Sequence, residues 1–438
     1  MKKKYILFTL LLSYCCAVHT QTITWEERAP LPERITNNAL ATATVGGIPY
    51  VFSFAGIDST KACGHTHLKS FRYDTQLDFW EPIAPLPDPM GGKIAAGAST
   101  VKNKIYIVGG YHVDSNCGEI SSDKIHIYDP ETNAYLPDGA PLLKAIDDHV
   151  QAVWRDSLIF VVTGWSNTTN VTNVQIYNPA TDVWTAGTPV PNANDWRVFG
   201  GSGEIIGDTI YYIGGASPQC NLNVCFPPTS YLRKGVINPS NPAEITWEGQ
   251  ADPAAQGYRM GATTADNTII WLGGSDLTYN FNGIDYNGTG GVAPTGRVTL
   301  LNANSGFLSQ LEGQIPAIMD LRGVAKISES TFIIAGGMEA NQVVTNKVFQ
   351  INIDDLTAIV EPNIATQLIF PNPVSDVLRF SRAGNFSVEI LDSQGKTVLP
   401  KQAIHHQALN VKNLDSGIYF IRIFDKNKVI DFQKIIKI

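Results

Sequence analysis

The stretch "KIYIVGGYH", Lys104 to His112, decides the fold, because its pattern returns along the chain. A short apolar run, rich in β-branched and aromatic residues, follows a turn signal such as Lys102-Asn103 and ends in glycine. That order is typical of the second strand of a hairpin. The intervals between successive copies are 54, 54, 51, 59 and 63 residues, which predicts six similar units of about four strands. The glycines that mark them are Gly56, Gly110, Gly164, Gly215, Gly274 and Gly337.

A second phrase follows the glycines in the first three units. It reads "YDTQLDFW" (Tyr73 to Trp80), "YDPETNAY" (Tyr128 to Tyr135) and "YNPATDVW" (Tyr177 to Trp184). Each copy places an aromatic residue seven positions after a tyrosine, with turn-forming residues between them. Together with the glycine doublet, this spacing resembles the kelch repeat over about residues 22–355. The resemblance implies a β-propeller in which the large rings fill the wedges between neighbouring blades.

The two ends of the repeat region complement each other. "WEERAPLP" (Trp25 to Pro32) matches "WEPIAPLP" (Trp80 to Pro87), so the N-terminal segment supplies an outermost strand without a third strand of its own. "KVFQINIDD", ending at Asp355, is a third strand without a successor. Pairing these segments would close the ring and remove two open sheet edges. We therefore predict an all-β fold with a six-bladed kelch-type β-propeller over residues 21–355.

The opening stretch also poses a question of chemistry at Tyr111 and His112. Because Gly109-Gly110 marks a blade, these two residues are expected to begin the loop after a second strand, and a structural role is favoured over a catalytic one. "CGHTH" (Cys63 to His67) could gather imidazoles with His112. Kelch-type copper oxidases use Tyr and His ligands, but they have seven blades and further ligands without counterparts here. We predict no metal site and no cofactor.

The N-terminus has the order of a secretory signal peptide. "MKKK" precedes an apolar run from Ile6 to about Leu12, and small and polar residues lead to Gln21. The run is too short to span a bilayer. We predict a signal peptide over residues 1–20, an exported chain and no transmembrane anchor.

The last segment of the chain changes character. After a predicted linker over residues 356–363, alternating strands broken by Asn, Asp and Gly turns predict a small antiparallel β-sandwich over residues 364–438. Pro371-Asn372-Pro373, "LDSGIYFIRI" (Leu414 to Ile423) and the basic tail Lys434 to Ile438 closely resemble the type A C-terminal sorting domain of the type IX secretion system of Bacteroidota. The resemblance implies that the secretion machinery is a partner and that the protein is secreted or lies on the outer cell surface. The alternative is an ordinary carbohydrate-binding sandwich.

Charge separates the same two regions. The chain has 32 basic and 40 acidic residues, for a net charge of −8. From Pro362 onward the balance reverses, with 10 basic and 6 acidic residues. The acidic body argues against nucleic acid as a partner, and the reversal supports a domain boundary.

The cysteines outside the signal peptide are Cys63, Cys117, Cys220 and Cys225. An even count in an exported chain predicts disulfides, and the spacing does not fix their connectivity. Cys63 and Cys117 occupy equivalent loops of adjacent blades, so a bridge between them would tie those blades together.

Two surfaces are candidates for function. The first is the propeller face that carries the long loops at 57–70, 111–123, 216–231 and 275–296, because long loops on a rigid scaffold commonly bind ligands. The second is the central channel, where residues at the start of the innermost strands should converge. Arginines there could form an anion site, or they could pair with Asp147, Asp148 and Asp320; both readings stay open. The candidate channel residues are Lys93, Asp148, His149, Arg197, Tyr258, Arg259 and Arg322.

No GxSxG, HExxH, P-loop or dinucleotide motif appears in the sequence. The leading expectation is a non-enzymatic, secreted propeller that binds a glycan or protein ligand through its long-loop face. The alternative is a sugar-active enzyme similar to the six-bladed kelch sialic-acid mutarotases, whose acidic substrate would suit the arginines.

Overall fold

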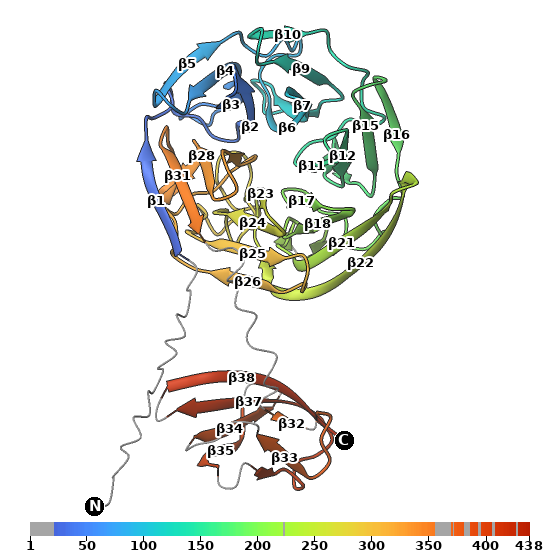
Figure 1. Ribbon diagram of the computed structural model, residues 1–438, viewed down its shortest axis with the longest axis vertical. Helices are drawn as coiled ribbons and strands as arrows, with labels where there is room; N and C mark the ends of the chain where they lie inside the picture. The colour runs from blue at the N-terminus through green and yellow to red at the C-terminus, as the bar shows by residue number, and fades with distance from the viewer. Residues whose placement is uncertain are drawn as a thin grey trace, which may run out of the picture. The chain divides into compact units, whose positions relative to one another are not determined.

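The computed structural model describes residues 22–438 apart from 222–223, 355–368, 371, 381–385, 393–395, 405–407 and 426–427. The predicted signal peptide at 1–20 and linker at 356–363 lie outside these residues. Contacts divide the chain into two compact units, Met1–Ile359 and Val360–Ile438. The first unit is a ring of six antiparallel sheets, five with four strands and one with an added fifth strand (Figure 1). The six-bladed propeller predicted from the repeat is therefore present.

Each blade runs from an inner strand beside the axis to an outer strand at the rim (Figure 1). Blade 1 contains β2 (Ala39–Val45), β3 (Ile48–Ile57), β4 (Thr66–Asp74) and β5 (Phe79–Ile83). Blade 2 contains β6 (Ile94–Val101), β7 (Lys104–Val113), β9 (Ile125–Asp129) and β10 (Ala134–Leu136). Blade 3 contains β11 (Val150–Trp154), β12 (Leu158–Val162), β15 (Val174–Asn178) and β16 (Val183–Ala186).

The remaining blades follow the same order. Blade 4 contains β17 (Ser202–Ile206), β18 (Thr209–Ile213), β21 (Ser230–Asn238) and β22 (Asn241–Gln256). Blade 5 contains β23 (Gly261–Ala265), β24 (Thr268–Leu272), β25 (Val298–Asn302) and β26 (Leu308–Leu311). Blade 6 contains β27 (Ala325–Lys326), β28 (Thr331–Ala335), β31 (Val348–Asp354) and, as its outer strand, β1 (Thr22–Arg28).

The closure of the ring is the one predicted from the two ends. β1 pairs antiparallel with β31 along its whole length, from Thr22 opposite Asp354 to Arg28 opposite Val348. Figure 1 shows the N-terminal strand lying beside the last strand of the propeller. Seven residue pairs thus join the two ends of the domain, so the facing edges of β1 and β31 are both paired.

The Tyr-to-Trp phrase links blades 1 and 3 to the blades that precede them in the ring. In blade 1 the Tyr73 hydroxyl donates to Asp78 (2.5 Å), and Asp78 also accepts the backbone N–H of Ala29 (2.9 Å). The indole of Trp80 donates to the Ala29 carbonyl (3.0 Å). Blade 3 repeats this pattern with Tyr177, Asp182 and Trp184 around Ala140. The recurring spacing therefore serves inter-blade hydrogen bonding as well as packing of rings.

A second ring of hydrogen bonds surrounds the axis. One residue before or near each inner strand has a left-handed backbone, with φ between 46° and 66°. The N–H of each such residue, or of its successor, donates to the equivalent residue of the preceding blade; Asp148 N–H donates to Ala95 O and Gly200 N–H donates to Asp148 O. We call these positions the axial ring: Asn37, Ala95, Asp148, Gly200, Arg259 and Asp320.

Tyr111 and His112 were expected to begin a loop, but both lie within a strand. β7 continues through both residues to Val113, because Tyr111 and His112 pair with Ser121 and Ile120 of the added strand β8 (Glu119–Ser121). Several other long connections also form short hairpins. These are β13 (Trp165–Ser166) with β14 (Thr169–Asn170), β19 (Cys220–Asn221) with β20 (Val224–Cys225), and β29 (Met338–Glu339) with β30 (Val343–Val344), around the 3-10 turn η1 (Ala340–Gln342).

The predicted disulfides are present. Cys63 is bonded to Cys117, which joins the loop after β3 to the loop after β7 and so ties blade 1 to blade 2. Cys220 is bonded to Cys225 within the β19–β20 hairpin. These pairings supply the connectivity that the sequence left open.

The C-terminal unit is a two-sheet antiparallel sandwich. One sheet holds β32 (Ile369–Phe370), β33 (Val377–Phe380) and β36 (Ala408–Asn410), and the other holds β34 (Ser387–Asp392), β35 (Thr397–Ala403), β37 (Gly417–Asp425) and β38 (Lys428–Lys437). Leu378, Val388 and Ile421 are fully buried between the sheets. The Asn372 side chain donates to Lys434 O and accepts from Ile436 N–H, both at 2.8 Å. The sequence motifs at 371–373 and 434–438 are therefore paired with each other.

Candidate functional site

The axial ring positions charged side chains in the middle of the channel. Arg259 lies between two carboxylates, with Nη2 2.6 Å from Asp148 Oδ2 and Nη1 2.9 Å from Asp320 Oδ1. Arg322 Nη1 lies 3.5 Å from Asp148 Oδ1. The exposed fractions of Asp148, Arg259 and Asp320 are at most 2%. We call these four residues the axial plug, because their side chains separate two cavities on the axis.

In the axial plug, burial and ion pairing shift the pKa values of the charged groups in opposite directions. Burial favours the neutral form of Arg259, but Asp148 and Asp320 outweigh it and raise the pKa of this guanidinium. Burial raises the pKa of Asp320, although Arg259 and a hydrogen bond from the Thr36 hydroxyl oppose the rise. A buried arginine with two carboxylates has no spare charge for a ligand. Of the two roles considered for the channel arginines, Arg259 therefore has the second: it pairs with aspartates and does not form an anion site.

A cavity of about 100 Å³ lies against the axial plug on the long-loop face. Its lining comes from the segments that lead into the innermost strands, from the ends of the second strands and from the long loops that follow them. We call it the loop-face cavity. Its lining residues are Tyr111, Glu119, Asp147, Asp148, Trp165, Phe199, Phe226, Arg259, Asn280 and Tyr286.

One side of the loop-face cavity is an aromatic wall. Phe199 is the centre of this wall, with its ring centroid 5.6 Å from Trp165, 5.4 Å from Phe226 and 6.0 Å from Tyr286, all in edge-to-face orientation. Phe199 is buried, whereas the other three rings are partly exposed. The wall therefore presents ring surface and ring edges to a ligand while its core is fixed by packing.

The other side carries carboxyl groups. Asp147 is buried and accepts a hydrogen bond from the Ser121 hydroxyl (2.5 Å), and burial together with the neighbouring Asp148 raises its pKa well above the usual value. Burial also raises the pKa of Glu119, although Arg259 opposes the rise. The cavity thus combines two carboxyl groups with raised pKa values and the ion pair between Arg259 and Asp148.

The structure places Lys93 in a different cluster. Its ammonium group is fully buried and pairs with Asp88, and it lies 3.2 Å from His126 Nε2. His126 Nδ1 is 2.8 Å from Asp138. Lys93 precedes the axial-ring residue of its blade, Ala95, by two positions, so its side chain enters the interior of the blade instead of the channel.

The other predicted channel residues are distributed on several sides of the axial plug. Tyr258 is fully buried beneath Arg259, with its hydroxyl donating to Tyr279 O (3.2 Å). His149 is buried and its Nε2 donates to Gln151 Oε1 (2.9 Å); burial lowers its pKa to about 4. Arg197 precedes the axial-ring position Gly200 by three residues, and its Nε has no hydrogen-bond partner within the described chain. Arg322 faces a second cavity, on the opposite side of the axial plug.

Sequence reasoning missed the aromatic wall and Glu119. Trp165 follows the glycine mark Gly164 directly, as Tyr111 follows Gly110, and this position could have been identified as a cavity-lining one. Phe226, Tyr286 and Glu119 come from loops of unequal length, so no spacing rule places them. Across the described residues, no group of three or more His, Cys, Asp or Glu side chains is arranged to hold a metal ion.

Two family profiles match the chain. The secretion system C-terminal sorting domain matches residues 368–438, and the kelch motif matches residues 95–135. The chain therefore carries kelch repeats in its propeller and a secretion sorting domain at its C-terminus. The sorting domain indicates export through the type IX secretion system to the cell surface or the medium. No helix in the described part of the chain is long and apolar enough to cross a membrane.

Curated relatives and a solved structure agree with the kelch assignment. The chain is 27% identical over 271 residues to the Kelch-like protein terF of Aspergillus terreus, covering 59% of this chain and 53% of that protein. It is 22% identical over 223 residues to Kelch-like protein 36 of Bos taurus, covering 51% and 33%. The chain thus spans about half or less of these relatives' length. The solved structure of YjhT superposes with a TM-score of 0.57 at 16% identity, covering 74% of this chain and 98% of that one, which shows a shared fold.

Proposed function

We propose that the exported propeller binds a carbohydrate in the loop-face cavity. The observation that carries this proposal is the opposition, across one cavity, of an aromatic wall and a set of carboxyl groups beside Arg259. Sugar rings offer apolar C–H faces that pack on aromatic rings, and hydroxyl groups that donate to carboxylates and accept from protonated carboxyls and guanidinium groups.

The size of the cavity limits the mode of binding. Ligand pockets usually exceed about 300 Å³, and this cavity has about 100 Å³. One edge or one exocyclic group of a sugar fits inside, and the long loops would contact the rest. This favours the terminal residue of a larger glycan over an isolated free sugar.

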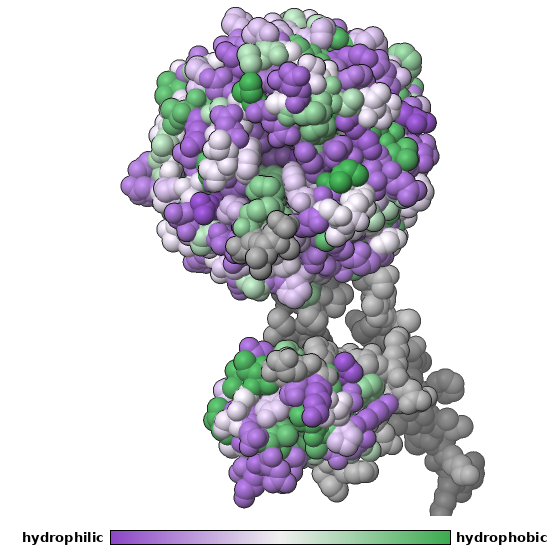
Figure 2. All heavy atoms as spheres, turned by 180° about the vertical axis from the view of Figure 1, so that it is seen from behind, coloured by the Kyte–Doolittle hydropathy of each residue, from purple (hydrophilic) through white to green (hydrophobic). Residues whose placement is uncertain are grey.

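The side of the propeller seen in Figure 2 is covered mostly by hydrophilic residues with scattered apolar ones. This surface favours a polar ligand over a large apolar protein partner on that side.

The test is a glycan array followed by titration calorimetry with the best ligand. Tyr286→Ala should weaken binding about three- to tenfold, the range expected for one aromatic contact. Glu119→Gln should weaken it by a similar factor, because one charge-assisted hydrogen bond is lost. Glu27→Gln, on the exposed outer strand β1, is the matched control. Unchanged affinity in both cavity variants would contradict the proposal.

The same cavity supports a second candidate, a sugar-active enzyme similar to the kelch sialic-acid mutarotases. Burial raises the pKa values of Asp147 and Glu119, and raised carboxyl pKa values are what a general acid near neutral pH requires. Exchange spectroscopy on the anomers of a bound sugar tests it. Accelerated anomer exchange that Glu119→Gln abolishes, without loss of affinity, would favour the enzyme; binding without acceleration would favour the carbohydrate-binding protein.

A further inference from the structure

A second cavity lies on the axis, on the opposite side of the axial plug. It has about 90 Å³, and an outer chamber of about 160 Å³ lies next to it, because Leu40, Ser99 and Glu204 line both. The outer chamber leads along the inner strands toward the turns that join the first and second strands. We call the inner space the hairpin-face cavity. Its wall is made largely of small residues: Gly97, Ala98, Ser99, Gly201, Ser202, Gly203, Ala262 and Gly323.

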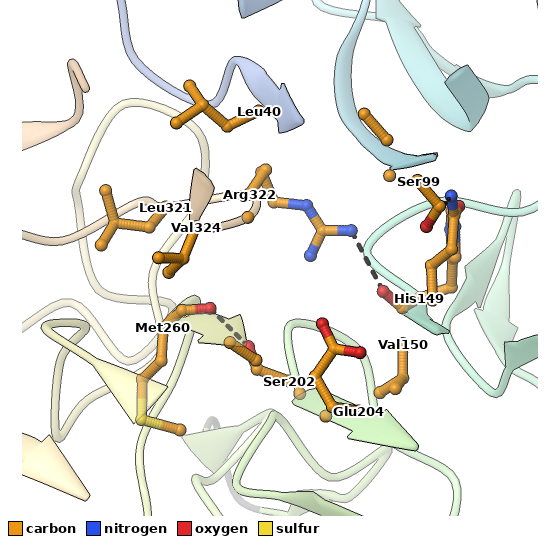
Figure 3. A pocket seen from close by; sticks show the side chains of 17 residues that line it. Leu40, Ser99, His149, Val150, Ser202, Glu204, Met260, Leu321, Arg322 and Val324 are labelled. Carbon is orange, nitrogen blue, oxygen red and sulfur yellow. Dashed lines mark hydrogen bonds between the residues drawn. The ribbon is translucent and has the colours of Figure 1, made fainter. Parts of the chain in front are cut away.

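Arg322 brings an unused hydrogen-bond donor to this cavity. Figure 3 shows its side chain extending across the channel, with Nη2 donating to the carbonyl of His149 (3.1 Å). Nη2 also lies 3.4 Å from Ala95 O, and Nη1 lies 3.5 Å from Asp148. Nε of Arg322 is buried and has no partner within the described residues. The residue is only 9% exposed, so bulk water does not replace the missing partner. A buried, unsatisfied guanidinium N–H is costly unless a ligand or water completes it.

Glu204 supplies a second group to the same cavity. Its carboxyl group extends into the channel from β17 (Figure 3), and no ion pair within the described residues involves it. Burial raises its pKa to about 8, with the backbone N–H of Ile205 and the ammonium of Lys326 opposing the rise. At neutral pH the carboxyl group is therefore mostly protonated and can donate a hydrogen bond.

Most of the remaining polar groups of the cavity are already paired, but His149 Nδ1 is buried and has no partner within the described residues. The Ser202 hydroxyl donates to Met260 O (2.6 Å), and Gln151 accepts from His149 and donates to Ser99 (2.9 Å each). His149 is neutral because its pKa is lowered to about 4. The groups left for a ligand are thus two donors, the cationic Arg322 Nε and the protonated Glu204, and one acceptor, His149 Nδ1.

We propose that the hairpin-face cavity binds a small monocarboxylate anion of about the size of formate or acetate. One carboxylate oxygen accepts from Arg322 Nε and the other accepts from the Glu204 hydroxyl. The volume has room for about three water molecules, so a sugar ring is excluded. Lys326, one-third exposed at the outer chamber, draws anions toward the entrance although it pairs with Glu329. This proposal does not rest on the carbohydrate proposal.

The site should respond to pH through Glu204. Only the protonated carboxyl group can donate to the anion, and the ionised form would repel it. Affinity should be constant below pH 7 and fall about tenfold per pH unit once the pH exceeds the pKa of Glu204. The other charged groups near the cavity are Arg322, Asp148 and Lys326, and His149 is neutral over this range because burial lowers its pKa to about 4.

The experiment is a ¹³C NMR titration of the full chain with labelled acetate and formate at pH 6, 7, 8 and 9. The expected result is saturable, millimolar binding that weakens above pH 8. Arg322→Gln should weaken it about tenfold or more. Glu204→Gln keeps an N–H donor, so binding should persist while its loss above pH 8 disappears. Glu204→Leu, which removes the donor, should weaken binding at every pH.

The controls distinguish the hairpin-face cavity from anion binding elsewhere on the protein. Glu119→Gln, in the loop-face cavity, should leave acetate binding unchanged. If Arg322→Gln does not fold, the contrast between Glu204→Gln and Glu204→Leu still decides the question. Absence of saturable binding would overturn the proposal. Equal binding by the wild type and all Glu204 variants would also overturn it, because the anion would then bind elsewhere.

Discussion

Arg259 is the residue on which the centre of the propeller depends. It is 1% exposed and bonds to carboxylates from two different blades. Removing one partner of a buried ion pair leaves an uncompensated charge. We expect Arg259→Gln to lower the free energy of unfolding by about 3–5 kcal/mol.

The matched control for Arg259→Gln is Arg155→Gln. Arg155 pairs with Asp208 at 2.8 Å, but its side chain is 52% exposed. An exposed pair contributes about 0–1 kcal/mol. Urea denaturation of both variants measures the difference, and equal destabilisation by the two would show that burial of the axial plug does not matter for stability.

The raised pKa of Glu204 predicts that the stability of the propeller depends on pH. Its pKa rises from an ordinary 4.5 to about 8 in the folded protein. Between these values the folded state binds more protons than the unfolded state, so this group's contribution destabilises the fold as pH rises and is least favourable above pH 8. Glu204→Gln should therefore raise Tm relative to the wild type at pH 9 and much less at pH 5. Thermal melts beside Glu27→Gln measure this, and a difference that does not grow with pH would contradict the assignment.

Single residues were predictable only where the repeat fixes their position. Counting back from the glycine marks identified Asp148, Arg259 and Arg322, but only Asp148 and Arg259 are axial-ring residues, and Arg322 follows the axial-ring residue of its blade by two positions. Lys93 and Arg197 precede their axial-ring positions by two and three residues, because the approach to the inner strand differs between blades. The aromatic wall depends on loop conformation, which no local pattern determines.

At the level of elements, β1 closes the ring. Deleting residues 22–30 would remove the seven residue pairs between β1 and β31 and the hydrogen bonds of Ala29 with Asp78 and Trp80. We expect the cooperative melting transition of the propeller to be lost, because both blade 6 and its junction with blade 1 lose partners. Circular dichroism against the chain beginning at Gln21 measures this. An unchanged melting transition would contradict the role of β1.

The two disulfides should differ in their contribution to stability. Cys63–Cys117 spans 54 residues and Cys220–Cys225 spans 5. Loop-closure entropy predicts about 4 kcal/mol for the longer loop and about 2 kcal/mol for the shorter. Chemical denaturation of the two double Cys→Ala variants measures this order. A larger loss for the Cys220/Cys225 pair would show that chain entropy is not the main term.

Most elements could be predicted because their signals are local. The glycine marks, the hairpin turns and the Tyr-to-Trp phrase lie within each blade, and the structure uses them for strand ends and inter-blade bonds. The continuation of β7 through Tyr111 and His112 was not predicted, because it depends on pairing with β8, a strand too short to leave a sequence pattern.

At the scale of the molecule, the propeller and the sandwich are separate units with their own cores. Removing residues 364–438 should leave the melting transition of the propeller unchanged but prevent export, because the sorting domain contributes no blade. Cell fractionation with an antibody to the propeller measures this. Normal delivery of the truncated protein to the surface or the medium would contradict the sorting role.

Carbohydrate binding in the loop-face cavity is tested most sharply by a crystal structure of the protein with the best ligand from the glycan array. We predict density for a terminal sugar between the aromatic wall of Trp165, Phe226 and Tyr286 and the carboxyl groups of Glu119 and Asp147. Density for the same ligand on the outer rim of the blades or in the C-terminal sandwich, with this cavity empty, would contradict carbohydrate binding at this site.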